Sequence, residues 1–432
     1  MIKEKIKTAD DEAKEYLDLQ LSKGRESRFE NVLTSIFMIG FVFFFAIAFW
    51  IVPDRSFSEE ENRSLQTFPE FKWESFIHGD FNSDFGTYMA DQFPLRNFFI
   101  GVKAFSETVQ LKGQNNSVII GDDGYLIARS DYPDEEMLDT NLKSAGNFIP
   151  VAKKNGIDCF VAFAGRKIDV MDSVVPSLYG SYYSDRIFNI LEEKAGEYGI
   201  DYLDLRDTLR NAGEDSLYYK TDHHWKSLGA YYAYCEIVKA MGITPYELSD
   251  FDIETATDSF FGTTWSSAGV KWTEADTIEY FRWDGDTCLT TKIESPRYEY
   301  KTAKDITEGG KSFKVFEGCY VREMLETKDK YASFLGGNNN GYVEVTMEGK
   351  DGTQIKAREK LVVVRDSFAD SLAPFLARHF DLILLDLRTE TPDTITLCKK
   401  LGVDRILFLY NMETLTTSKD LGKLNNKLSS HK

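Results

Sequence analysis

A run of 21 consecutive uncharged residues, 32–52, is the feature that most constrains the fold of this chain. Six of these residues are phenylalanine, and the run is long enough to cross a bilayer as one helix. Lys23, Arg25 and Arg28 precede it, whereas acidic side chains dominate the segment after it. Because basic flanks stay in the cytoplasm, the sequence predicts a cytoplasmic tail at 1–31, a single transmembrane helix at 32–52, and a main domain outside the cell membrane.

A cleaved signal peptide is the alternative, since Ala46-Ile47-Ala48 resembles a cleavage site that follows an apolar run. Two features favour the anchor over the signal peptide. The segment before the run is long, and residues 49–52 extend the apolar stretch to full membrane length.

Charge and cysteine usage exclude several classes of protein. The chain carries 70 Asp and Glu against 51 Lys and Arg, and its net charge of −19 would repel a nucleic acid, so we expect no nucleic-acid partner. The five cysteines lie far apart, with no Cys-x-x-Cys pair. That spacing argues against a zinc ribbon, a thioredoxin-like motif and a dense disulfide framework.

Short apolar runs alternate with helical patterns between residues 53 and 432, which is typical of an α/β fold with a mostly parallel sheet. The predicted strands are 159–163, 202–205, 361–364, 382–387 and 406–410. The predicted helices are 140–155, 183–198, 227–241, 368–379 and 393–402. The segment at about 243–355 breaks this rhythm, and we interpret it as an insertion between two halves of one sheet.

Histidine is scarce in this chain, which makes the run Thr221-Asp222-His223-His224-Trp225 conspicuous. Residues two apart in an extended segment project to the same side, so Asp222 would orient the imidazole of His224 as a general base, with His223 pointing away. One alternative is a helix-capping Asp222 with two incidental histidines. The other is a metal site, which needs a third ligand, and no other His or Cys lies nearby in the sequence.

Ser367 follows an apolar run and precedes a helical pattern, so it would sit at the carboxyl end of a strand and near a helix N-terminus. Helix N-termini stabilise anions, and the Ser367 N–H would supply one donor for an oxyanion. The alternative is an ordinary helix N-cap. The conjunction of Asp-x-His with strand-Asp-Ser favours a Ser-His-Asp site for acyl transfer over these separate readings.

Further runs accompany this pair in a fixed order. They are Asp91-Gln92-Phe93-Pro94-Leu95-Arg96, Gly121-Asp122-Asp123-Gly124-Tyr125-Leu126, Phe260-Phe261-Gly262-Thr263, Phe334-Leu335-Gly336-Gly337-Asn338 and Asp386-Leu387-Arg388. With Asp222-His223-His224-Trp225 and Asp366-Ser367-Phe368, they make residues 57–412 resemble the DHHW protein family, among the alginate O-acetyltransferase-like SGNH hydrolases.

The resemblance implies a three-layer SGNH-hydrolase-like fold, with an N-terminal extension at 53–135 and a catalytic domain at 136–432. As in that family, the Asp-x-His element precedes the serine element, which implies Ser367 as nucleophile, His224 as base and Asp222 as its orienting group. No cofactor and no metal are implied.

One departure from the family pattern concerns the turn before the nucleophile. The expected Gly-Asp-Ser reads Arg365-Asp366-Ser367 here, and the bulky residue puts the geometry of the turn in doubt. Asp366, Asn338 and Arg388 are further candidates for oxyanion or substrate binding. For Arg388 a surface ion pair is the alternative, and for Asn338 a simple turn.

The function that the resemblance implies is a membrane-anchored O-acetyltransferase that modifies a cell-surface or secreted polysaccharide through an acetyl-serine. A membrane-bound O-acyltransferase partner would supply the acetyl group from the cytoplasmic side. Two alternatives remain: a carbohydrate acetylesterase with the same three residues, and a non-catalytic protein that binds or assembles wall polymers.

Overall fold

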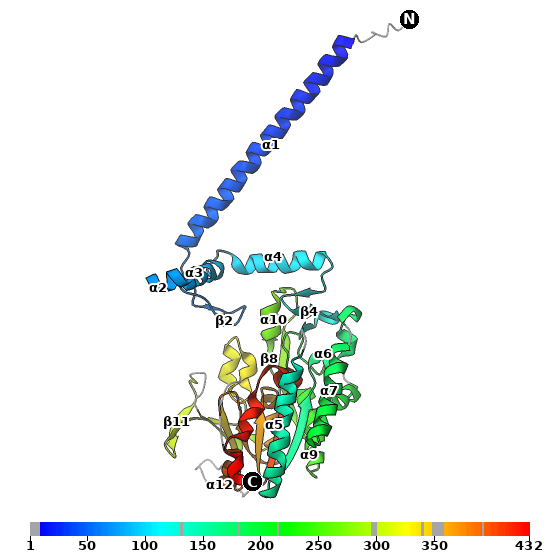
Figure 1. The fold of residues 1–432 in the computed structure, drawn as a ribbon, viewed down its shortest axis with the longest axis vertical. Helices are drawn as coiled ribbons and strands as arrows, with labels where there is room; N and C mark the ends of the chain where they lie inside the picture. Colours follow the sequence, from blue (N-terminus) through cyan, green and yellow to red (C-terminus); the bar gives the residue numbers. More distant parts are fainter. Residues whose placement is uncertain are drawn as a thin grey trace. The chain divides into compact units, whose positions relative to one another are not determined.

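The computed structural model describes residues 9–129, 133–179, 182–213, 216–294, 300–337, 341–347, 358–390 and 393–432 (Figure 1). The chain divides into two compact units. The N-terminal unit comprises the residues up to 58 together with 63–99, and the C-terminal unit comprises 59–62 and 100–432.

The N-terminal unit is built on one long helix, α1 (Ala9–Ile51), drawn in blue in Figure 1. Within α1, Arg28–Ile51 is long and apolar enough to cross a membrane, and among the described residues it is the one helix of that kind. Two short helices follow, α2 (Trp73–His78) and α3 (Asp80–Asp91). Gly79 separates them with a φ of 90°, a left-handed conformation that favours glycine and ends α2.

A nine-stranded sheet forms the centre of the C-terminal unit, in the order β11-β12-β10-β13-β15-β14-β16-β6-β7. Its last five strands are parallel to one another. They are β6 (Asp158–Ala164), β7 (Leu203–Asp204), β14 (Lys360–Arg365), β15 (Asp381–Leu385) and β16 (Arg405–Asn411). These are the five strands that the apolar runs predict.

The prediction of a mostly parallel sheet is wrong, because the sheet is mixed. Four more strands extend the sheet beyond β15 through antiparallel pairs, and β13 is the one that pairs with β15. They are β10 (Leu289–Glu294), β11 (Lys304–Glu308), β12 (Lys311–Glu317) and β13 (Tyr342–Met347). All four lie in the segment interpreted as an insertion. A two-residue Gly309-Gly310 turn joins β11 to β12, and such a tight hairpin enforces antiparallel pairing.

Helices cover both faces of the parallel strands, because alternate side chains of β14 enter different hydrophobic clusters. Leu361 and Val363 pack with helices α8, α9 and α11, whereas Val362 and Val364 pack with α5, α7, α12 and α13. These helices are α5 (Glu135–Lys154), α7 (Tyr182–Tyr198), α8 (Leu205–Asn211), α9 (Ser227–Ala240), α11 (Phe368–Leu376), α12 (Thr394–Leu401) and α13 (Met412–Thr417). The helices predicted from the sequence are thereby confirmed, with small shifts at their ends.

Smaller elements complete the two units. They are β1 (Phe57–Ser58), β2 (Arg63–Ser64), α4 (Arg96–Val109), β3 (Gln114–Asn115), β4 (Val118–Ile120), β5 (Leu126–Ala128), α6 (Lys167–Val170), β8 (Asp252–Phe260), α10 (Thr263–Ala268), β9 (Asp276–Arg282) and the short 3₁₀ helix η7 (Lys330–Ser333). Of these, α10 and η7 bring side chains to the site described next.

Candidate active site

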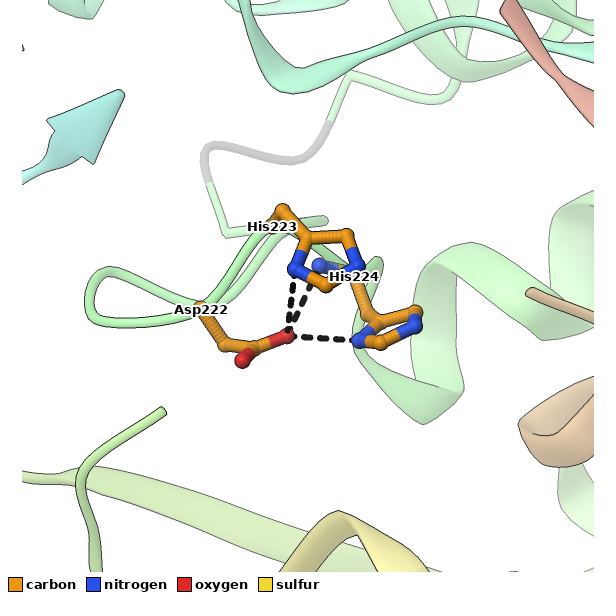
Figure 2. Close-up of side chains that lie close together, drawn as sticks. All are labelled: Asp222, His223 and His224. Atoms are coloured by element: carbon orange, nitrogen blue, oxygen red, sulfur yellow. Dashed lines mark hydrogen bonds and ion pairs between the residues drawn. The ribbon is translucent and has the colours of Figure 1, made fainter. Parts of the chain in front are cut away.

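The Asp222-His223-His224 loop is a tight turn that leads into α9. Its two ends pair through the Lys226 N–H, which donates to Leu217 O over 2.7 Å. The Asp222 carboxylate oxygen Oδ1 accepts the backbone N–H of His224 over 3.0 Å and lies 2.6 Å from Nδ1 of the same histidine (Figure 2). The carboxylate therefore fixes both the backbone and the imidazole of His224.

Ser367 lies between β14 and α11, as the sequence predicts, and its Oγ lies 2.7 Å from Nε2 of His224. The imidazole thus has Asp222 on one nitrogen and Ser367 on the other. With Nδ1–H donating to the carboxylate, Nε2 presents its lone pair to the serine hydroxyl, which is the arrangement that a general base requires. The structure brings together the three residues that the sequence singles out, although 143 positions separate Ser367 from His224.

The Asp222 carboxylate is buried but well supplied with hydrogen bonds. Its second oxygen accepts the N–H of Thr263 over 2.8 Å and the Thr263 hydroxyl over 3.0 Å. Burial opposes ionisation, yet the adjacent imidazoles of His223 and His224, together with the hydrogen bonds from His224, hold the pKa of Asp222 well below its usual range. At neutral pH, Asp222 is therefore a carboxylate that can stabilise a positive charge on His224.

His223 does not point away from the site, and that prediction is wrong. Its ring lies 3.9 Å from the ring of His224, centroid to centroid, and its Nδ1 lies 2.9 Å from the Thr263 hydroxyl. The reason is that the loop turns sharply, so the alternation of an extended strand does not apply. Burial and the neighbouring imidazole lower the pKa of His223, which favours a neutral ring.

A metal ion is the other role considered for this cluster, and the candidate ligand atoms of Asp222, His223 and His224 lie within 4.8 Å of one another (Figure 2). The 2.6 Å between Asp222 Oδ1 and His224 Nδ1 is a hydrogen-bond distance. Two ligands of a tetrahedral zinc ion, each about 2.0 Å from the metal, would lie about 3.3 Å apart. The geometry therefore favours a hydrogen-bonded pair over a metal site.

Tyr331 is a site residue that the sequence analysis missed. Its ring stacks on the His224 imidazole at 3.9 Å and 8°, and its hydroxyl lies 3.1 Å from Ser367 O and 3.0 Å from Ser371 Oγ. It belongs to η7, within the segment interpreted as an insertion. Since the chain has 22 tyrosines, no local signal distinguishes this one.

Trp225, the last residue of the histidine motif, ties the loop to the helix behind the serine. Its indole N–H is shared by Phe368 O at 3.1 Å and Ser371 Oγ at 2.9 Å, and the side chain is fully buried. This contact sets the spacing between the His224 loop and α11.

The turn before Ser367 is unstrained in spite of Arg365. Ser367 has φ −68° and ψ −15°, ordinary values for a helix start. The Arg365 side chain is fully buried, and its guanidinium lies 3.0 Å from the carboxylate of Asp370. The bulky residue thus extends into the protein interior, which removes the doubt about the geometry of the turn.

Of the three weaker candidates, the structure describes Asp366 and Arg388. Asp366 supports the turn, since its buried carboxylate accepts the N–H groups of Phe368 over 3.0 Å and Asn411 over 2.6 Å. Arg388 lines the same cleft as Ser367, and its guanidinium also binds the Asp386 carboxylate. Asn338 lies outside the described residues.

A cleft of about 430 Å³ opens in front of Ser367. Its walls come from the β3–β4 turn, α10, the start of α11 and α13, with Arg388 and Glu413 as the charged side chains among the described residues. Side-chain hydroxyls dominate the remaining polar lining, contributed by Ser117, Thr263, Thr264, Ser267, Thr414 and Thr417. This cleft is therefore suited to a ligand that is rich in hydrogen-bonding groups.

Comparisons with known proteins find one matching family and solved structures of similar fold. The family described as DHHW protein matches residues 153–385. A DHHW family protein from Eubacterium siraeum is similar in structure, with a TM-score of 0.55 and 21% identity over 72% of this chain and 96% of the other. PatB1 from Bacillus cereus, solved with a sulfonyl adduct, has a TM-score of 0.54 and 15% identity over 70% of this chain and 98% of its own. No curated protein matches the sequence.

Gly262 generates a prediction about the Asp222 carboxylate. A Cβ at position 262 would lie 2.3 Å from Asp222 Cβ and from Oδ2, so Gly262→Ala must displace the carboxylate that orients His224. We expect sulfonylation of Ser367 by a sulfonyl fluoride, followed by mass spectrometry, to slow by about tenfold or more, which corresponds to about 1.4 kcal/mol.

Gly196→Ala is the matched control, because a Cβ there meets no atom within 4 Å. Its sulfonylation rate should equal that of the unchanged protein. Equal rates for all three proteins would show that the position of Asp222 does not control the reactivity of Ser367.

Proposed function

The chain belongs to the DHHW protein family, and on that basis we propose that it is an O-acetyltransferase acting on an extracytoplasmic polysaccharide through an acetyl-serine intermediate. The observation that carries the proposal is the hydrogen-bonded series Asp222–His224–Ser367 at the edge of a polar cleft. The acetyl group and the polysaccharide are taken from the family that the sequence resembles.

In the first half of the proposed reaction, His224 Nε2 removes the hydroxyl proton of Ser367 as Oγ attacks the carbonyl carbon of an acetyl donor. The bond from that carbon to the leaving oxygen breaks, and the proton on Nε2 passes to the departing group. Asp222 stabilises the imidazolium that forms between these steps. Such proton transfer accelerates a reaction by about 10² to 10⁴.

In the second half, a sugar hydroxyl loses its proton to His224 and attacks the carbonyl of acetyl-Ser367. An ester to the sugar forms, the bond to Oγ breaks, and the serine recovers the proton. The Ser367 N–H at the start of α11 is the proposed donor to the oxyanion of both steps. Tyr331 is a positioning residue in both steps. Its ring stacks on the imidazole of His224, and its hydroxyl donates to the backbone carbonyl of Ser367.

Two further observations support the proposal. The Bacillus cereus neighbour holds a sulfonyl adduct, and sulfonyl groups are captured by nucleophilic side chains. The hydroxyl-rich lining of the cleft in this chain matches the hydrogen-bonding groups of a carbohydrate.

Hydrolysis of acetylated carbohydrate by the same three residues is the second candidate function, because water can replace the sugar hydroxyl in the same geometry. A non-catalytic role in binding or assembling wall polymers is the third. The hydrogen-bonded series of Ser367, His224 and Asp222 favours the two enzymatic functions over the third.

For the location of the protein, we propose that α1 crosses the cell membrane once, with the N-terminus in the cytoplasm. The basic residues before the apolar run support this orientation. Because acetyl-CoA is cytosolic, the acetyl group must cross the membrane, and a membrane-bound O-acyltransferase is the proposed partner that delivers it.

Protease added outside intact cells or spheroplasts tests this orientation. We expect digestion of the C-terminal unit and protection of an epitope placed in the segment 1–31. If the N-terminal epitope alone were lost, the orientation would be reversed.

Variants of the three residues test the catalytic roles through release of a chromogenic acetyl ester. Ser367→Ala and His224→Ala should lose about 10⁴-fold or more of kcat/KM, and Asp222→Asn about 10³- to 10⁴-fold, because residues that act as a unit fail together. His223→Ala is the matched control, and should stay within about tenfold, since it removes a ring beside the base but not the base. Equal losses at His223 and His224 would contradict the assignment of the base.

The lifetime of acetyl-Ser367 separates transfer from hydrolysis. A transferase should hold the acetyl group in water and release it faster when an oligosaccharide positions a hydroxyl in the cleft, because alignment alone accelerates such a step by orders of magnitude. The measurement is loss of labelled acetyl from the protein with and without polysaccharide fragments, together with detection of acetylated sugar. Prompt release in water, slowed by added fragments, would favour the esterase.

A further inference from the structure

The N-terminal unit exposes many large apolar side chains in the segment 68–99, which follows α1 in the sequence. Trp73 and Ile77 on α2 are 71% and 76% exposed, and Leu95 and Phe98 are each 61% exposed. We call the segment 68–99 the apolar platform. Its exposed apolar members are Phe68, Phe71, Trp73, Phe76, Ile77, Met89, Phe93, Leu95 and Phe98.

The platform does not contain a core of its own that would explain these side chains. Helix α2 has no buried residue, and α3 buries Tyr88 and Asp91 alone. Its rings contact one another in a continuous series, as in the pairs of Phe71 with Trp73 and with Phe81. A continuous apolar patch of this kind marks a surface that another apolar phase covers.

Contacts with α1 set the depth of the platform. Phe45 of α1 stacks on Phe93 at 5.2 Å and contacts Phe99 at 5.6 Å, while Phe49 contacts Tyr88 at 5.6 Å. Phe45 lies six residues before Ile51, the last residue of α1, which is about 9 Å along the helix axis. If α1 spans the membrane and leaves it near Ile51, Phe93 lies about 9 Å below the membrane surface. That depth is within the roughly 15 Å of one leaflet's hydrocarbon.

Two buried polar side chains of the platform, Asp91 and Gln92, have internal hydrogen-bond partners, as an apolar surrounding requires. The Gln92 amide accepts the N–H of Arg55 over 3.0 Å and donates to the carbonyl oxygens of Arg55 and Gln66 over 2.9 Å each. The Asp91 carboxylate pairs with Arg63 and accepts the N–H of Gln66. The backbone groups of Arg55 and Gln66 can therefore lie near lipid without losing these hydrogen bonds.

We infer that the apolar platform is embedded in the outer leaflet of the membrane, with phospholipid as its occupant. The inference rests on the proposal that α1 is a membrane anchor. Trp and Phe side chains at the junction of a spanning helix with a soluble unit are typical of residues that lie at a bilayer surface. This chain would thus be held by a helix and by a second, monotopic element.

A membrane-restricted photoreactive probe tests the inference on the full chain. The protein is reconstituted in vesicles of phosphatidylethanolamine and phosphatidylglycerol, a hydrophobic diazirine is photolysed in the bilayer, and labelled residues are mapped by mass spectrometry. We expect label in α1 and in 68–99. Leu178, 84% exposed, and Ile253, 52% exposed, are internal controls that should remain unlabelled, although they are apolar and accessible.

The variant with Ile77→Ser and Leu95→Ser should lose label in 68–99 and keep it in α1, whereas Leu178→Ser should change neither. Label in α1 without label in 68–99 would overturn the inference, and would leave a protein partner as the occupant of the platform. Label in 68–99 without label in α1 would show that the platform contacts lipid by itself, and would refute the anchor and with it the placement of the platform in the outer leaflet. Absence of label from both segments would refute both.

Discussion

The hydrogen bond between Ser367 Oγ and His224 Nε2 joins parts of the chain that are distant in sequence, and the arrangement around it depends on the whole sheet. Ser367 follows β14, so it lies at the carboxyl end of the parallel strands, where α11 begins. The turn before α9 delivers His224, and Trp225 fixes that turn against α11. The 2.7 Å distance between Ser367 Oγ and His224 Nε2 therefore depends on how α9, α11 and β14 pack together.

The segment 243–355 contributes side chains to the site and strands to the sheet. Thr263 at the start of α10 holds the outer oxygen of Asp222, and Tyr331 in η7 covers one face of the imidazole. Through β13, which pairs with β15, the same segment is joined to the parallel strands that carry Ser367. It is therefore an integral half of the fold.

The parallel half of the fold could be predicted because its strands are continuous apolar runs, as in 361–364 and 406–410. The antiparallel half could not, since β10 buries alternate residues only and its pairing is decided by distant partners. At the site, Asp222, His224 and Ser367 were predicted from local pattern and resemblance. Tyr331 could not be, because stacking on His224 is a purely tertiary contact. The direction of His223 was missed because a turn cannot be distinguished from an extended segment by spacing.

The buried pair of Arg365 and Asp370 behind the nucleophile restricts how this sequence can change. Burial raises the pKa of the Asp370 carboxyl to about 6 even with the guanidinium 3.0 Å away. Loss of Arg365 alone would leave an uncompensated acidic group in the interior, at a cost of about 3–5 kcal/mol, whereas replacing both by apolar residues is often neutral. The two positions are therefore coupled in stability: a glycine before Asp366 costs least when residue 370 is apolar as well.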